Sequence, residues 1–229
     1  MNVSIIIPVY NEENNIHSCL QSLQNYNQKA EVIVVDGGSV DDTLIISKPL
    51  ADKIIISTKG RAKQMNAGAK QATGDMLLFL HADTILPKSA LTLISQAPLL
   101  GNRWGRFDIQ LSGKIKALKI ISALMNWRSR ITGIATGDQV IFVSKKLFNE
   151  VKGYDDIFLM EDINLCTKLK KITPPLCLKE KVISSGRRWE KNGLVKTILL
   201  MWSLRIRYFF GENTEILSIL YSKGRFWKT

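Results

Sequence analysis

Cysteine is scarce in this sequence. Its 229 residues include three cysteines, Cys19, Cys166 and Cys177, and no C-x-x-C pair. An odd number of cysteines without that spacing argues against a disulfide framework and against a zinc site built on thiolates. We therefore expect small thiols in a reducing compartment, and we place the chain in the cytoplasm.

Long apolar runs are also absent. The sequence has no stretch of about 18 uninterrupted apolar residues, so it predicts no transmembrane helix. The segment Met1–Pro8 lacks the basic start and the small-residue cleavage site of a signal peptide. No internal repeat, low-complexity tract or linker rich in Pro or Ser occurs. A hydrophobic content of 45% is enough to build a core.

Several ligand-binding signatures are missing. No G-x-G-x-x-G follows the first expected strand, which disfavours a dinucleotide enzyme, and there is no P-loop. A net charge of +12 implies anionic partners: nucleic acid, the phosphates of a small ligand, or an anionic membrane surface. Helix-turn-helix, zinc and RNA-binding signatures are absent, so a nucleic-acid-binding protein is the weakest of our function hypotheses, and we expect no nucleic-acid partner.

Apolar runs alternate with helix-forming stretches in the first hundred residues. The runs at Val3–Val9, Glu31–Asp36, Lys53–Ser57 and Asp75–Leu80 predict buried strands. Their alternation with helices predicts an α/β fold with a parallel, doubly wound sheet. The expected helices are one with Ile16, Leu20 and Leu23 on its apolar face, then Asp42–Lys48, Gly60–Ala72 and Pro87–Gln96, the last opened by proline.

The second half of the chain is less regular. Excess Lys and Arg residues accumulate there, from Arg103 onward. We expect one domain over residues 1–190 and an amphipathic helical segment over residues 191–229. The expected elements are the strands Trp104–Leu111, Gln139–Val143 and Lys179–Ser184 and the helices Lys114–Arg130, Glu161–Lys171 and Gly193–Phe210.

Polar side chains follow three of the expected strands. Because ligands of open parallel sheets bind at the carboxyl ends of the strands, the segments Tyr10–Glu12, Asp36–Ser39 and His81–Asp83 predict a binding edge. The Asp36 carboxylate suits a ribose or a base, or a turn in which it caps the next segment. The Asp83 carboxylate suits a divalent cation, or a helix N-cap.

Two further clusters carry side chains suited to catalysis or phosphate binding. Glu161 and Asp162 open an expected helix, where paired carboxylates act either as a general base or as ordinary helix-dipole partners. Arg187 and Arg188, followed by Trp189, suit a diphosphate, since arginine pairs bidentately with phosphate oxygens. A solvated basic turn is the alternative for this second cluster.

Taken together, these segments resemble family 2 glycosyltransferases of the GT-A fold, and in particular a bacterial subgroup of short, single-domain members. The resemblance covers roughly residues 3 to 190. It implies a Rossmann-like, mostly parallel sheet flanked by helices, followed by a helical C-terminal segment. The blocks that carry it are, in order, VSIIIPVYNEE, VVDGGSVDDT, GRAKQMNAGAK, LLFLHADT, TGDQ, LMEDINL and SGRRW.

The resemblance also implies an activity and residue roles. The chain would move one sugar from a nucleotide-sugar donor, a UDP-sugar being the commonest in the family, to an acceptor hydroxyl with inversion. Asp162, next to Glu161, would be the catalytic base, and Asp83 would ligate Mg²⁺ or Mn²⁺. The implied donor-binding set is Pro8, Tyr10, Glu12, Asp36, Gly38, Arg61, Asn66, Gly68, Ala82, Arg187, Arg188 and Trp189.

Two departures from the family pattern limit the metal ligands and the type of transfer that the resemblance implies. His81 stands where the family's D-x-D metal motif has its first aspartate, and a hard cation gains little from a nitrogen ligand. Ser185 stands where the processive polymer synthases of the family have glutamine, so we expect transfer of a single sugar. A nucleotide-sugar-binding module without turnover is the alternative, and it would need no Asp162.

The expected C-terminal helix is amphipathic. Val195, Leu199, Trp202, Ile206 and Phe209 recur on one stripe, and Lys196 and Arg207 lie on another. Such a helix suits an anionic membrane surface, a dimer partner or docking on the core. The helix expected over Lys114–Arg130 has the same alternatives. Membrane contact, at the inner face of the cell membrane, would fit a lipid-linked acceptor.

Overall fold

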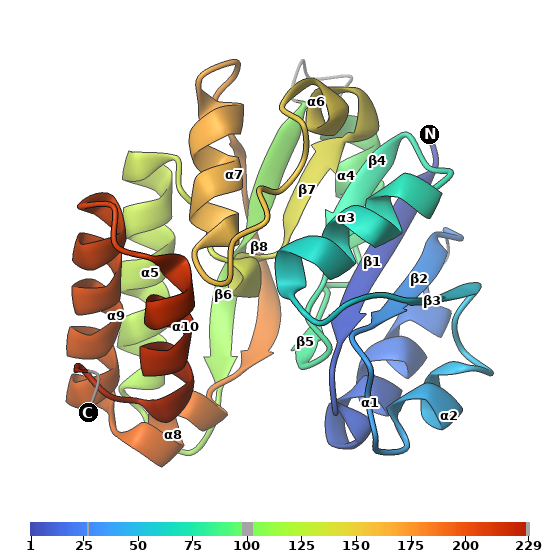
Figure 1. Ribbon diagram of the computed structural model, residues 1–229. Coiled ribbons are helices and arrows are strands. Elements are labelled where there is room, and N and C mark those ends of the chain that lie inside the picture. The colour runs from blue at the N-terminus through green and yellow to red at the C-terminus, as the bar shows by residue number, and fades with distance from the viewer. Residues whose placement is uncertain (27, 98–102, 228–229) are drawn as a thin grey trace.

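The sequence forms one curled sheet with helices packed on both of its faces (Figure 1). The structure is a computed structural model that describes residues 1–26, 28–97 and 103–227. Eight strands of this described part lie in the order β3 (Lys53–Ile56), β2 (Glu31–Asp36), β1 (Val3–Val9), β4 (Met76–Phe79), β7 (Ile141–Ser144), β6 (Trp104–Ser112), β8 (Leu176–Ser185) and β5 (Thr84–Ile85).

The N-terminal half supplies the parallel part of the sheet. β1 pairs in parallel with β2 and with β4, and β2 pairs in parallel with β3. This confirms the α/β fold with a mostly parallel sheet. The remaining strands are mixed: β7 runs antiparallel to β4 and β6, β8 is parallel to β6, and β5 is antiparallel to β8. These antiparallel pairs were not predicted, because the periodicity of a strand carries no information on its direction.

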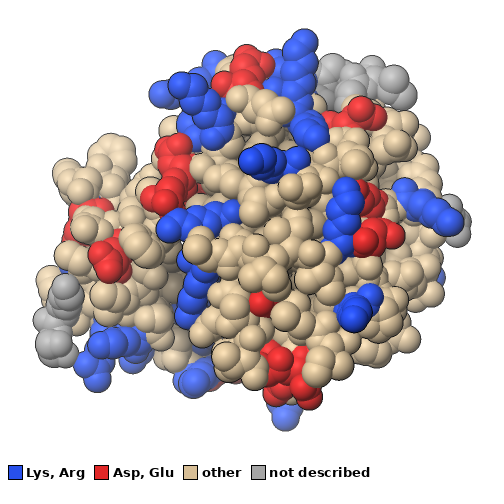
Figure 2. Space-filling model, turned by 45° about the vertical axis from the view of Figure 1, so that its right-hand side comes forward, with Lys and Arg blue, Asp and Glu red and all other residues tan. Residues whose placement is uncertain are grey.

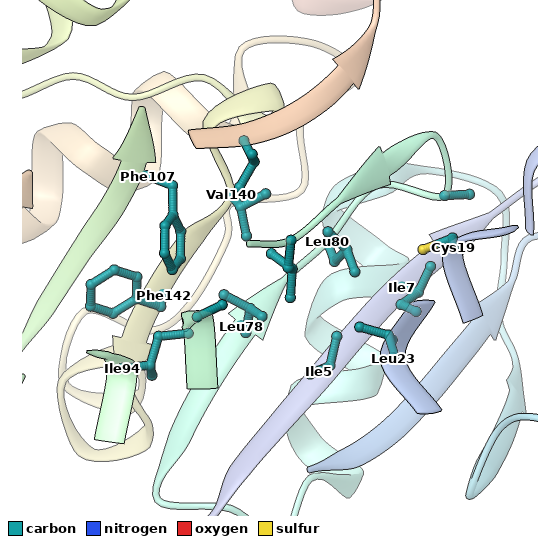
Figure 3. Packing of buried hydrophobic residues seen from close by; sticks show 14 of the residues in the cluster. Ile5, Ile7, Cys19, Leu23, Leu78, Leu80, Ile94, Phe107, Val140 and Phe142 are labelled. Carbon is teal, nitrogen blue, oxygen red and sulfur yellow. The ribbon is translucent and has the colours of Figure 1, made fainter. Parts of the chain in front are cut away.

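The continuous apolar run of β1 follows from burial on both faces of the sheet. Successive side chains of a strand point to opposite faces. Ile5 and Ile7 therefore pack into one core cluster, while Ile6 packs into the other. Figure 3 shows Ile5 and Ile7 in the first cluster, which also contains Leu78. Fully burying one such side chain contributes about 1.5–3 kcal/mol.

Helix positions match the expected ones with shifted boundaries. The helix expected over Pro87–Gln96 begins only at Ala90, because Pro87 lies in a turn whose carbonyl accepts the Ala90 N–H. The helix expected from Lys114 begins at Leu118. The helices are α1 (Glu13–Gln24), α2 (Thr43–Ser47), α3 (Arg61–Gln71), α4 (Ala90–Gln96), α5 (Leu118–Thr132), α6 (Lys145–Glu150), α7 (Glu161–Lys170), α8 (Arg187–Asn192), α9 (Leu194–Phe209) and α10 (Thr214–Lys223).

The last two helices pack on each other and on the segment that leads into α7. Leu200 and Leu204 of α9 share a buried cluster with Leu217 of α10 and with Leu159 and Met160. The C-terminal helices therefore support the loop that carries the Glu161–Asp162 pair. Within the described residues, no helix is long and apolar enough to cross a bilayer.

The close contact between α3 and the sheet gives a stability test at Gly68. A Cβ at this position would lie 2.5 Å from Ile6 Cγ2 and 3.0 Å from Val35 Cγ2. We expect Gly68→Ala to lower the free energy of unfolding by about 1–3 kcal/mol through overpacking, a cost that exceeds the helix-propensity gain. Urea denaturation would measure it. Lys70→Ala, at an exposed position of the same helix, should change it by less than about 0.5 kcal/mol.

Candidate active site

A large cavity lies at the carboxyl ends of β1, β4 and β8. Its volume is about 710 Å³. Five basic and three acidic side chains line it, so it suits an anionic ligand. In Figure 2, Lys and Arg side chains form a column left of centre on the face shown. The lining residues are Pro8, Glu12, Arg61, His81, Ala82, Asp83, Asp138, Ser185, Arg187, Arg188, Trp189, Lys191, Asn192, Tyr221, Ser222 and Lys223.

A second hollow of about 450 Å³ adjoins the first. Pro8, Glu12 and Arg61 line both, and Tyr10 lines only the second. The Lys59 ammonium lies 3.6 Å from the centre of the Tyr10 ring. The end of β1 and the start of α3 thus form a continuous surface with an aromatic ring at one side, where a planar base can stack.

The Asp36 carboxylate lines neither hollow. It accepts hydrogen bonds from the Gly38 N–H at 2.9 Å and from the Ser39 N–H at 2.9 Å, and also one from the Ser39 hydroxyl. Gly38 has a φ of +89°, which non-glycine residues rarely adopt. Asp36 and Gly38 therefore fix the loop after β2, which is the turn alternative that the sequence left open. A donor contact through Asp36 stays a prediction.

Asn66 and Gly68 lie inside the fold and line neither hollow. The Asn66 side chain donates to the Tyr154 carbonyl at 2.8 Å and accepts from the Tyr154 N–H at 3.0 Å. Gly68 is the contact point between α3 and the sheet. Their geometry gives both residues a packing role, and it gives no support to the prediction that they contact the donor.

The turn after β4 places His81, Ala82 and Asp83 in the wall of the large cavity. The Asp83 Oδ2 atom is 3.5 Å from Arg187 Nη2. His81 Nδ1 is 3.5 Å from Asp138 Oδ1, across the cavity wall. The histidine that replaces the family's first aspartate is thus already engaged with a carboxylate.

Few side chains of the cavity can ligate a divalent cation. No group of three His, Cys, Asp or Glu side chains within the described segments could hold a metal ion by itself. Asp83 offers one carboxylate in a cavity rich in arginine. Mg²⁺ and Mn²⁺ often take only one or two protein ligands and complete their coordination with phosphates and water. The residues present therefore fit a cation that enters together with a diphosphate.

Glu161 and Asp162 open α7 next to this cavity. Asp162 Oδ2 accepts from the Gly137 N–H at 2.7 Å, and Asp162 Oδ1 accepts from the Ile163 N–H at 2.7 Å. Asp162 lines a small hollow of about 10 Å³ whose wall includes His81. His81 also lines the large cavity, so its imidazole lies between that cavity and Asp162.

The buried Glu161 carboxylate links α7 to α3, with its Oε1 atom 3.8 Å from Arg61 Nη1. Burial and the neighbouring charge of Asp162 raise the pKa of Glu161, and the Arg61 charge offsets only part of that rise. Arg61 therefore links α3 to α7, and both helices carry predicted site residues.

Asp138 is a cavity residue that the sequence reasoning did not select. It lies in the 3₁₀ turn Gly137–Gln139, which a Thr136–Gln139 capping box holds. Burial acts to raise the pKa of Asp138, but the hydrogen bond and charge of His81, with the charges of Arg61 and Arg188, lower it overall. The TGDQ block contained the available signal: a carboxylate directly after glycine, between two expected elements.

The basic cluster after β8 forms the short helix α8. Arg188 stacks on the Tyr221 ring at 3.7 Å and donates to the Tyr221 carbonyl at 3.0 Å. Lys223 follows Tyr221 in the cavity wall. The C-terminal helix α10, which belongs to the expected helical segment 191–229, thus completes the cavity wall.

Backbone strain gathers near the site. Among the described non-glycine residues, positive φ values occur at Asn11 (+53°), Val140 (+52°), Lys152 (+61°) and Met160 (+70°). Three of these four directly adjoin the segments that carry Glu12, Asp138 and Glu161. Such strain persists only where the surrounding structure imposes it, and it is concentrated at functional sites.

Comparison with known sequences agrees with this geometry. Residues 4–97 match the sequence profile of Glycosyl transferase family 2. Over these residues the chain is similar to family 2 glycosyltransferases. The match covers the end of β1, the loop after β2, the start of α3 and the His81–Asp83 turn, which are four of the segments around the candidate site.

Curated members of the family are similar to part of this chain. The N-acetylglucosaminyltransferase of Bradyrhizobium elkanii is 36% identical over 118 residues, which are 45% of this chain and 65% of that protein. An undecaprenyl-phosphate 4-deoxy-4-formamido-L-arabinose transferase of Pseudomonas savastanoi pv. phaseolicola is 28% identical over 145 residues, 58% of this chain and 41% of that protein. The chain thus spans less than two thirds of the length of either relative.

Solved structures of family-related enzymes share the fold. Staphylococcus aureus TarS in complex with UDP-GlcNAc superposes with a TM-score of 0.63 at 21% identity, over 81% of this chain and 58% of that one. The mannosyltransferase PcManGT of Pyrobaculum calidifontis, in complex with GDP-Man and Mn²⁺, gives 0.67 at 17% identity, over 97% and 69%. The fold of this chain is therefore similar to that of GT-A glycosyltransferases.

The raised pKa of Glu161 predicts a pH dependence of stability. The folded state holds this proton more tightly than the unfolded state, so the free energy of unfolding falls as pH rises above the ordinary value of 4.5. Glu161→Gln removes this titration. We expect the difference in unfolding free energy, variant minus wild type, to increase between about pH 4 and pH 7 in urea denaturation.

The control for this test is Asp42→Asn, which changes an exposed carboxylate. Its difference from wild type should stay flat over the same pH range. A flat difference for Glu161→Gln as well would contradict the burial argument.

Proposed function

We propose that this chain transfers one sugar from a nucleoside-diphosphate sugar to an acceptor hydroxyl, with inversion at the anomeric carbon. The observation that carries the proposal is the basic cavity at the carboxyl ends of β1, β4 and β8, where Asp83 lies opposite arginines. A diphosphate requires such positive charge, and a leaving diphosphate requires more of it in the transition state. The match of residues 4–97 to the family 2 profile supports the same reaction class.

The nucleoside occupies the surface formed by Pro8, Tyr10 and Glu12. Tyr10 offers a ring for base stacking, and Arg61 lies where this surface meets the large cavity. We propose uridine as the base. TarS holds UDP-GlcNAc and PcManGT holds GDP-Man, so the family fold accommodates both bases. The Asp36–Gly38 loop keeps its shape through internal hydrogen bonds and borders the end of β1.

The diphosphate lies near Asp83, Arg187 and Arg188. A Mg²⁺ or Mn²⁺ ion on Asp83 would supply positive charge against the diphosphate oxygens. Arg187, which is exposed and 3.5 Å from Asp83, can turn to the phosphates, since its guanidinium pairs bidentately with such oxygens. Trp189 and Ala82 shape the adjoining wall.

Asp162 is the proposed general base. Two backbone N–H groups hold its carboxylate at the start of α7, close to the cavity and behind His81. Glu161 fixes this helix start through Arg61. Asp138, which lines the cavity itself, is the alternative candidate for the base, and its partner His81 lines both the cavity and the hollow at Asp162. Ser185 lines the cavity at the position where processive synthases have glutamine, and we therefore propose that a single sugar is transferred.

The acceptor is a hydroxyl group, which we propose is carried by a lipid at the cytoplasmic face of a membrane. The name of the Pseudomonas savastanoi relative contains undecaprenyl phosphate, which supports the lipid part of this acceptor but names a phosphate where we propose a hydroxyl. The function that competes with transfer is nucleotide-sugar binding without turnover, which keeps the donor cavity but makes Asp162 dispensable.

Replacing the base separates these two functions. We expect Asp162→Asn to lower turnover by about 10²–10⁴-fold, the usual contribution of general-base catalysis, while donor affinity stays unchanged. Nucleoside diphosphate release with acceptor present measures turnover, and calorimetry measures donor affinity. Asp42→Asn is the control, since Asp42 is exposed and outside both hollows.

A parallel Asp138→Asn variant makes the test of the base decisive. If Asp138→Asn loses turnover and Asp162→Asn does not, the base is misassigned. If no variant and no wild-type sample turns over any donor that it binds, the binding-module alternative holds.

A donor panel tests the nucleotide and the cation together. We expect UDP-sugars to raise the melting temperature more than GDP- or dTDP-sugars, and the rise to need Mg²⁺ or Mn²⁺. Binding at 100-fold excess over Kd stabilises the fold by about 2.7 kcal/mol. Asp83→Asn should remove the cation dependence. Equal shifts with all three nucleotides, or equal shifts in a chelator, would contradict the assignment.

A further inference from the structure

Helix α5 presents a stripe of large apolar side chains to solvent. Ile120, Leu124, Trp127 and Ile131 are all exposed, and Trp127 is 65% exposed. Their spacing of four, three and four residues places them on one face of the helix. The opposite face packs on the sheet through residues such as Leu118. The exposed stripe is therefore separate from the side of α5 that packs on the core.

Helix α9 carries a second exposed stripe. Leu199, Trp202, Ile206 and Phe209 are exposed, with Trp202 at 66%, and Val195 extends the stripe toward the start of the helix. This is the apolar stripe that the sequence predicted. The side chains that α9 buries are different ones: Thr197, Leu200 and Leu204.

The two stripes belong to neighbouring helices. Both helices lie on the side of the molecule far from β1 to β3 (Figure 1), and Leu194 at the start of α9 packs against the buried cluster that contains Leu118 and Ile121 of α5. Arg128 of α5 and Arg205 of α9 are close enough to repel each other. We call the surface formed by the exposed residues of these helices the α5–α9 face. Large exposed apolar surfaces mark interaction sites.

The charged residues of α5 and α9 are all positive, and the acidic residue that follows α9, Glu212, is paired with Arg207. Within their described residues, neither α5 nor α9 contains Asp or Glu. Lys119 and Lys196 are exposed, and neither forms an ion pair in the described part of the chain. Successive helical residues are about 100° apart, so Lys119 beside Ile120 and Lys196 beside Val195 stand at the margins of the apolar stripes.

This charge decides between the possible occupants of the face. A second copy of the chain would bring the same lysines and arginines against this surface, and like charges facing each other oppose association. An anionic bilayer offers an apolar interior to the exposed apolar side chains and negatively charged phosphates to the lysines. Exposed tryptophan on an apolar stripe with lysine at its edges is the pattern of helices that lie in a membrane interface.

We propose that the α5–α9 face docks on an anionic lipid bilayer, with Trp127 and Trp202 inserted at the level of the headgroups and Lys119 and Lys196 on the lipid phosphates. The inference stands independently of the transfer reaction. Arg205, on the same helix, lies within electrostatic reach of Asp138 and Asp162. Docking would therefore hold the candidate active site beside the bilayer.

Flotation of the full chain with vesicles tests the proposal. One vesicle type is phosphatidylcholine alone, and the other also contains phosphatidylglycerol. The variants are Trp127→Ser with Trp202→Ser, and Lys119→Gln with Lys196→Gln. The matched control is Val40→Ser with Ile45→Ser, which removes exposed apolar side chains far from the α5–α9 face.

We expect wild type and control to float with the anionic vesicles. The tryptophan pair should weaken binding at least about tenfold. The lysine pair should weaken it by about fivefold per charge and remove most of its salt dependence. A donor-induced rise in melting temperature, unchanged in every variant, would show that each remains folded and would separate this test from that of the transfer reaction.

Three results would overturn the proposal. The first is wild-type protein that floats with neither vesicle type. The second is equal binding to both vesicle types that the tryptophan pair leaves intact. The third is a dimer, seen by light scattering without lipid, that the tryptophan pair dissociates while vesicle binding is absent, since a second copy would then be the occupant.

Discussion

The parallel pairing of β1 with β2 and with β4 is the constraint on which the candidate site depends. Because parallel strands end at one edge of a sheet, this pairing brings the segment after β1 and the turn after β4 together, so that Glu12 and Asp83 line one cavity. β8 enters the sheet parallel to β6 and delivers Arg187 to the same cavity. If any of these strands ran the other way, its polar end would lie at the opposite edge. Ile5, Ile6 and Ile7 bury β1 on both faces of the sheet and stabilise its central position.

Charge within the site is organised as linked pairs. Arg61 contacts Glu161, His81 contacts Asp138, and Arg187 contacts Asp83. Each pair joins segments that are distant in sequence, so ligand binding at one carboxylate changes the field at the others. A buried carboxylate such as Glu161 is costly unless a cation compensates it, and the raised pKa of Glu161 shows that Arg61 compensates it only in part. The site therefore carries built-in electrostatic and backbone strain, as expected where structure serves binding rather than stability.

The C-terminal helices connect the cavity with the α5–α9 face. α10 contributes Tyr221 and Lys223 to the cavity wall, and its partner α9 carries the exposed apolar stripe with Trp202. Both helices pack on the segment that leads into α7 through Leu204 and Leu217. A single buried cluster thus fixes the distance between the surface that we propose for a bilayer and the carboxylates that we propose for catalysis.

The sequence alone determined the strands, most helices and the polar ends that make the binding edge, because each of these is a local pattern of apolar and polar residues. The alternation of strands and helices also predicted that Glu12 and Asp83 lie at one edge of the sheet, and both line the same cavity. Tertiary structure decided the rest. The pairing of His81 with Asp138, the closure of the cavity by α10 and the clamp of Asn66 on Tyr154 all join residues far apart in the chain. Periodicity likewise reveals that a helix has an apolar stripe, but only the neighbours of α9 decide which of its sides is covered, and they leave Trp202 in solvent.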